Sequence, residues 1–163
     1  MHNDHRNVSA SANVTGLMAN ANSAPHAFDI ARSVLDADYE SVSVCRPKST
    51  DPKKEGASLF MALKTLGGRL MNVEINNNAS YGYDVGGGLV GERVSVFLRS
   101  AAASEFYAGL QTAASIKSIE TGKPAGASAW DGYASTSIAE AGVRSLESGA
   151  PVTVSPIAKP ALY

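Results

Sequence analysis

Side chains able to act on a small molecule are few in this sequence, and the most informative one is a histidine near a predicted helix start. His26 lies in "NSAPHAFDIARSVL", where Ser23 and Pro25 favour a helix N-terminus and apolar residues follow at helical spacing. The positive end of a helix disfavours a protonated imidazole, so His26 could accept a proton. Asp29 follows one turn later and could share a surface with it. A histidine at a helix end whose hydrogen-bonding groups already have partners, with Asp29 complementing the helix dipole, explains the same residues. Spacing alone favours this structural role.

Aromatic and acidic residues occur together in two further stretches. These are "YGYD", Tyr81 to Asp84, and "SAWDGY", Ser128 to Tyr133. Tyrosine and tryptophan rings can stack on a ligand while offering a hydroxyl or an N–H group. A tyrosine pair in the core and a tryptophan packed at a helix start are equally good explanations.

Other site chemistries are disfavoured. Gly86 to Gly91 match G-x-G-x-x-G, but the following "ERVSVFL" is typical of a strand, whereas dinucleotide binding needs a helix N-terminus there. His2, His5 and His26 lack the paired spacing of a zinc site, so we predict no metal and no bound cofactor. Cys45 is the only cysteine, which excludes an intrachain disulfide.

Charge and hydropathy narrow the class of protein further. The 163 residues include 14 Lys and Arg and 15 Asp and Glu, a net charge of −1 without a basic stripe, so nucleic-acid binding is not expected. The polar N-terminus "MHNDHRN" lacks a signal core, and no apolar run is long enough to span a bilayer. We therefore predict a cytoplasmic protein that does not bind membranes.

The predicted elements form one α+β domain over residues 1–155, followed by a tail over residues 156–163. Strands are predicted at His5 to Ser9, at Tyr39 to Cys45, in a hairpin turning at Gly67-Gly68, and in a pair turning near Gly91-Glu92. Ser11 to Ala24 reads as a connection. Helices are predicted from Ala102 to Glu120 and from Asp131 to Glu147, besides the one that carries His26. This order favours an open, mostly antiparallel sheet with helices on one face.

The other face of that sheet would then need cover. Val73, Ile75, Leu89 and Val96 are expected on it, and serine, asparagine and glycine alone would not hide them. A homo-oligomer formed through this sheet face is therefore predicted.

Several of these stretches, in this order, resemble the C-terminal domain of the Gfo/Idh/MocA oxidoreductases, especially the inositol 2-dehydrogenases. They are "HRN", "NSAPHAFDIARSVLD", "VEINNNASYGYDV", "VGERVSV" and "GKPAGASAWDGYASTSIAEAGVRSLESGAPVTV". The resemblance implies an open sheet that builds dimers and tetramers, and a sugar or cyclitol substrate held against an N-terminal Rossmann domain. It aligns His26 with the family's acid–base histidine. It also implies a catalytic pair, His26 and Asn22, with substrate contacts from Arg6, Asp29, Tyr81, Tyr83, Asp84 and Trp130.

Three departures from the family shape the functional hypothesis. No Rossmann domain or catalytic lysine is present in the sequence, Asn22 stands where the family has an aspartate, and the stretch between Leu98 and Ser104 is short. A neutral amide cannot stabilise imidazolium as a carboxylate does. We therefore predict a stand-alone domain reused for redox-neutral chemistry on a small molecule, as a cyclase, isomerase or lyase. The alternatives are a substrate domain or fragment of an inositol or sugar dehydrogenase, or a non-catalytic partner that binds one through the sheet.

Overall fold

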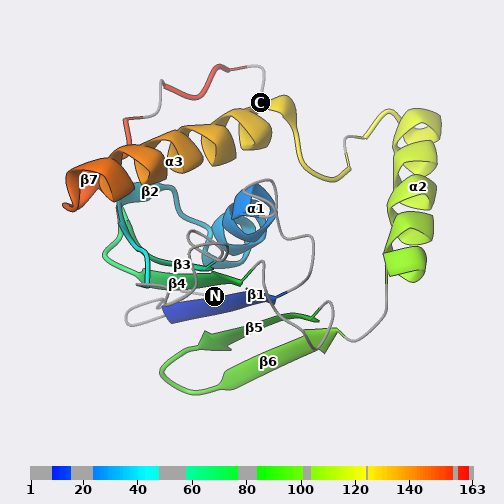
Figure 1. Ribbon diagram of the computed structural model, residues 1–163. Coiled ribbons are helices and arrows are strands. Elements are labelled where there is room, and N and C mark those ends of the chain that lie inside the picture. The colour runs from blue at the N-terminus through cyan, green and yellow to red at the C-terminus, as the bar shows by residue number, and fades with distance from the viewer. Residues whose placement is uncertain are drawn as a thin grey trace.

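The computed structural model describes residues 9–15, 24–47, 58–76, 84–100, 104–123, 125–155 and 158–161. The described residues form seven strands and three helices (Figure 1). They are β1 (Ser9–Thr15), α1 (Ala24–Leu35), β2 (Tyr39–Cys45), β3 (Ser58–Thr65), β4 (Leu70–Asn76), β5 (Asp84–Val90), β6 (Ser95–Ser100), α2 (Ser104–Thr121), α3 (Ala129–Ser148) and β7 (Val152–Thr153).

The seven strands form one open sheet in the order β6-β5-β1-β4-β3-β2-β7. Neighbouring strands are antiparallel except β1 and β4, which run parallel with Ala12 opposite Val73. The predicted α+β class with an open, mostly antiparallel sheet is confirmed. None of the helices in the described part of the chain is long and apolar enough to cross a membrane.

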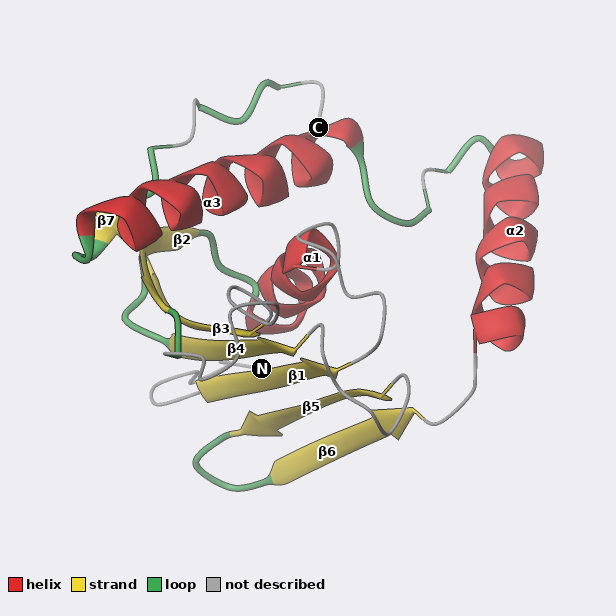
Figure 2. Cartoon of the chain, in the orientation of Figure 1, coloured by secondary structure: helices red, strands yellow, loops and turns green. Residues whose placement is uncertain are grey.

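The core lies between one face of the sheet and two helices, α1 and α3 (Figure 2). Alternate residues of the central strands point toward these helices, as the period of two along a strand requires. Leu63, Met71 and Val73 are buried from the sheet, and Phe28 and Ile138 are buried from the helices. Close packing is visible at Gly142 of α3, where an added Cβ would lie 3.5 Å from a Val44 methyl group.

The structure corrects the prediction for the first strand. Residues 1–8 lie outside the described part of the chain, and the described strand runs from Ser9 to Thr15, through a stretch predicted as a connection. The sequence "SASANVT" lacks the apolar alternation that marks a strand. It is held as a strand by hydrogen bonding on both sides, because β1 lies between β4 and β5.

The structure also corrects the prediction for the uncovered sheet face. Val73 and Ile75 were expected there, but they are fully buried beneath the helices. Leu89 is partly buried against the same core. Val96 is exposed, yet it pairs with Leu89 and so lies on the helix side of the sheet. Those four residues therefore cannot form an interface on the opposite face.

That opposite face, here called the open face, carries different apolar residues. The strand register places Phe60, Leu70, Val90 and Phe97 on the side away from Met71 and the other core residues of the sheet, and all four are exposed. The neighbouring strand positions include Ala62, Asn72 and Gly88, so much of this face is small or polar.

Helix α2 stands apart from the rest of the molecule (Figure 1). It makes no extensive contact with any other described element, and α1 and α3 cover only the β1 to β7 part of the sheet. No described helix packs extensively on β5 or β6. Ile116 and Ile119 of α2 are exposed as a result.

Candidate functional site

The site predicted from the sequence begins at the N-terminus of α1. The helix starts at Ala24, so Pro25 and His26 lie in its first turn, as expected. Ala27 and Phe28 face the core, and the His26 side chain is exposed. An exposed imidazole on a helix that is anchored by its other face is accessible to a ligand from outside.

Asp29 lines a groove that runs along the outer side of α1. The groove has a volume of about 710 Å³ and lies between α1, the connection from α2 to α3, and the C-terminal segment. Its lining includes Ile30 and Val34 from α1, Gly126 and Ala127 from the connection, and Lys159. Neither His26 nor Trp130 lines this groove.

A network around Arg32 fixes α1 against the start of α3. The Arg32 guanidinium donates from Nε to Asp38 Oδ1 at 2.7 Å and from Nη1 to Asp131 Oδ1 at 2.8 Å. The other Asp131 oxygen accepts from the backbone N–H and the hydroxyl of Ser128, both at 2.7 Å. Ser128 is the N-cap of α3, so Asp131 completes a capping box while it binds α1.

These contacts change the protonation equilibria of the pair. The Ser128 hydroxyl, then the Ser128 N–H and Arg32, lower the pKa of Asp131 to about 2. Burial alone would lower the pKa of Arg32, but its hydrogen bonds to Asp131 and Asp38 outweigh burial and raise it. Both groups are therefore charged near neutral pH.

Trp130 lies in the protein interior at the start of α3. Its ring is buried and packs on Tyr133 with 5.3 Å between ring centroids. Its Nε1 has no hydrogen-bond partner within the part of the chain that the structure describes. Tyr133 is the more accessible ring of the two. The packing of Trp130 agrees with the structural alternative considered for "SAWDGY", although a role in substrate binding stays a prediction.

The other predicted site residues fall outside what the structure describes. Arg6, Asn22, Tyr81 and Tyr83 are not among the described residues, and Asp84 is described only as the first position of β5. Their predicted roles therefore stay predictions.

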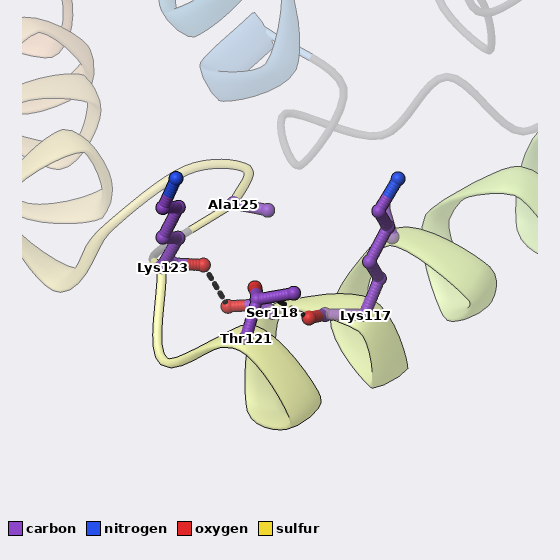
Figure 3. A pocket seen from close by; sticks show the side chains of 6 residues that line it. Lys117, Ser118, Thr121, Lys123 and Ala125 are labelled. Carbon is purple, nitrogen blue, oxygen red and sulfur yellow. Dashed lines mark hydrogen bonds between the residues drawn. The ribbon is translucent and has the colours of Figure 1, made fainter.

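A second, smaller hollow lies at the C-terminal end of α2 (Figure 3). Ser118 donates to the Lys123 carbonyl and Thr121 to the Lys117 carbonyl, each at 2.7 Å. Gly122, with φ of +65°, ends the helix in the left-handed conformation. Both hydroxyl groups therefore donate to backbone carbonyls at the C-terminal end of α2.

The described residues offer no fitting place for a dinucleotide or a metal. Gly86 to Gly88 lie inside β5, and the next element is β6, a strand that pairs with it. Phosphate binding by such glycines needs a helix N-terminus, which is missing here. No group of three His, Cys, Asp or Glu able to hold a metal ion is present among the described residues.

Sequence reasoning missed the Arg32 network and the groove. The S-x-x-D pattern in "SAWDGY" could also have identified Ser128 as the N-cap of the helix that was predicted from Asp131. The partner Arg32 lies on another helix, and no local pattern indicates a contact between residues so far apart in the chain.

Comparison with known proteins finds sequence relatives over the whole chain. No family model matches the chain. It is 35% identical to inositol 2-dehydrogenase 1 of Saccharopolyspora erythraea and 32% identical to inositol 2-dehydrogenase of Streptomyces avermitilis, in both cases over its whole length. The chain is related to the inositol 2-dehydrogenases of the Gfo/Idh/MocA family. This inositol-dehydrogenase-like chain spans 55% and 54% of those two relatives, about half of their length.

Solved structures agree on the fold of the inositol-dehydrogenase-like chain. Myo-inositol dehydrogenase from Lactobacillus casei, in complex with NAD(H) and myo-inositol, matches 95% of this chain with a TM-score of 0.77 and 22% identity. A putative myo-inositol dehydrogenase from Sinorhizobium meliloti matches 93% with a TM-score of 0.76. The match covers 56% and 58% of those two chains.

Proposed function

We propose that this chain is the polyol-binding part of an inositol-dehydrogenase-type oxidoreductase that acts in the cytoplasm. The observation that carries the proposal is the similarity over its whole length to inositol 2-dehydrogenases, at up to 35% identity. The match to about half of each relative agrees with a role as one part of such an enzyme.

The geometry around α1 supports this role. His26 is exposed in the first turn of α1, where its imidazole can form a hydrogen bond with a polyol hydroxyl. Asp29 lies one turn further, where its carboxylate can accept a hydroxyl hydrogen bond. Arg32 anchors the same helix to Asp131, so both side chains are carried on a fixed element.

A dinucleotide would have to be bound by residues other than those described here. The glycines of β5 do not fit that role, because a strand follows them. We therefore assign this chain the substrate side of the reaction and no step that involves the cofactor.

The hypothesis of a reused cyclase, isomerase or lyase has no observation in its favour among the described residues or the relatives. The similarity to dehydrogenases favours the alternative of a substrate domain. The open face, with Phe60 and Phe97 exposed, supports the further proposal that the chain self-associates there.

Calorimetric titration with myo-inositol tests the proposed function. We expect saturable binding that His26→Ala and Asp29→Asn each weaken about tenfold, the effect of losing a hydrogen bond to the ligand. Glu140→Gln, an exposed change on α3, is the matched control and should leave binding unchanged.

Two results would contradict the proposal. One is the absence of saturable binding of myo-inositol, scyllo-inositol and glucose at millimolar concentration. The other is unchanged binding by both α1 variants, because the ligand would then contact neither His26 nor Asp29.

A further inference from the structure

One carboxylate joins the two walls of the groove along α1. One wall is α1 itself, and the other, here called the connection wall, consists of Gly126 and Ala127. The residue that follows Ala127 is Ser128, whose backbone N–H and hydroxyl both donate to Asp131 Oδ2 at 2.7 Å. The other oxygen of Asp131 accepts from Arg32 Nη1 at 2.8 Å. The connection wall is therefore tied to α1 through a single side chain.

Little else holds the connection wall in place. Gly126 and Ala127 are both exposed. Gly126 has a φ of +81°, and apart from its chain neighbours no described atom lies within 4 Å of an added Cβ. With no side chain on one residue and a methyl group on the other, the wall has little apolar area to anchor it by burial. Its distance from α1 therefore depends chiefly on the ion pair between Arg32 and Asp131.

Arg32 is well suited to fix this distance. Its side chain is only 12% exposed, and its Nε donates to Asp38 Oδ1 at 2.7 Å while Nη1 donates to Asp131. The guanidinium group is planar, so binding two carboxylates at once fixes its orientation as well as its position. A lysine ammonium is a point charge on a flexible stem, and it would leave that orientation free.

We propose that the Arg32–Asp131 ion pair is a positioning device that sets the width of the groove and thereby determines which polyols bind. The inference rests on the proposed function, because Asp29, one of the residues assigned to the polyol, lines the same groove. Myo-inositol and scyllo-inositol differ only in the orientation of one hydroxyl group. A site distinguishes such isomers when its walls are held to within about 0.5 Å. Since their charged groups already pair with each other, Arg32 and Asp131 act as positioning residues.

Calorimetric titration of Arg32→Lys and Asp131→Asn with myo-inositol and scyllo-inositol tests the inference. Each substitution disrupts the ion pair with little change in side-chain size. We expect each variant to weaken binding of the preferred isomer about tenfold and to bring the two dissociation constants closer together. A purely structural role would reduce the fraction of folded, binding-competent protein and leave the ratio of the two constants unchanged.

Two variants serve as matched controls. Lys64→Gln removes the Lys64–Glu40 ion pair, which is 2.9 Å long and lies on the sheet outside the groove. Gly149→Ala strains the far end of α3, where the C-cap has a φ of +69°. Both should keep the wild-type ratio of dissociation constants. Hydrogen–deuterium exchange adds a measurement without ligand, in which the amides of residues 126–128 should exchange faster in Arg32→Lys than in either control.

Three titration results would overturn the inference. They are equal affinity of the wild type for the two isomers, a wild-type ratio in both Arg32→Lys and Asp131→Asn, and a control variant that changes the ratio as much as Arg32→Lys does. Unchanged exchange of residues 126–128 in Arg32→Lys would reject the positioning role alone. The absence of polyol binding by the wild type would instead reject the proposed function, and the selectivity with it.

Discussion

The Asp131 carboxylate joins two helices, since it caps α3 through Ser128 and binds Arg32 of α1. The pKa of this carboxyl in the folded protein, about 2, lies below the value of about 4 expected in the unfolded chain. Its contribution to stability is therefore complete above pH 4 and is lost as the pH falls toward 2.

We predict that Asp131→Asn lowers the free energy of unfolding by about 1 kcal/mol at pH 7, because the capping box of α3 loses its carboxylate. Urea denaturation followed by circular dichroism measures this difference. The gap between wild type and variant should shrink between pH 4 and pH 2, because the wild-type carboxyl becomes neutral there. Glu140→Gln is the control, and a gap that is constant with pH would contradict the role given to the Asp131 charge.

At the scale of single residues, the sequence predicted where a residue lies in an element better than which residues it contacts. The local pattern placed His26 in the first turn of a helix, which the structure confirms. Trp130 shows the limit, because a tryptophan at a helix start can face a ligand or the core, and only the tertiary packing decides between them. The Arg32 pairing with Asp131 was beyond prediction for the same reason.

Two glycines of α3 give opposite predictions for the same substitution. Gly149 ends the helix with φ of +69°, a conformation that costs other residues about 1 kcal/mol. Gly132 lies within the helix with open space at its Cβ position. We predict that Gly149→Ala lowers the free energy of unfolding by about 1 kcal/mol and that Gly132→Ala raises it by about 0.5 to 1 kcal/mol.

Thermal unfolding of the two alanine variants, measured side by side, checks this pair. Each serves as the control for the other, because the added methyl group is the same. Shifts of the same sign would show that backbone conformation does not govern the effect.

At the scale of elements, the alternation of apolar and polar residues, together with the turn residues, was sufficient to predict a strand wherever the strand has one buried face. β2, β3 and β4 were predicted nearly as they occur, because "YESVSVC" and the strands around Gly67-Gly68 alternate clearly. β1 was missed because small residues suffice for a strand that is hydrogen-bonded on both sides. Its neighbours come much later in the chain, so no local pattern reveals them.

The open face leads to a prediction for the whole molecule. Phe97 is 76% exposed there, and we expect Phe97→Lys to shift a self-associated chain to a monomer while the circular dichroism spectrum is unchanged. Multi-angle light scattering measures the mass. Leu66→Lys is the control, since Leu66 is 69% exposed in the turn between β3 and β4, outside the strands that form this face.

Ile75→Lys separates assembly from folding in the same experiment. Ile75 is buried in the core, so a lysine there should unfold the chain instead of dissociating a folded assembly. A wild-type chain that is monomeric at micromolar concentration, or a Phe97→Lys variant with wild-type mass, would contradict self-association through the open face.

We also predict that the chain by itself does not bind NADH. The reason is the strand that follows Gly86 to Gly88 in place of a helix. Fluorescence titration with NADH should show no saturable change, and a dissociation constant in the micromolar range would contradict this prediction. Bovine serum albumin at the same concentration controls for inner-filter effects.

The parallel pairing of β1 with β4 has a consequence for how the polypeptide acquires its structure. Ser9 lies opposite Leu70, so β1 is synthesised well before β4, the strand with which it pairs. The β3–β4 and β5–β6 hairpins close over short distances in the chain, whereas β1 joins them by a contact of high sequence separation, which slows folding. Until β1 is inserted, β4 and β5 have exposed edges that can pair with other chains, so this is the stage at which nascent molecules are most prone to aggregate.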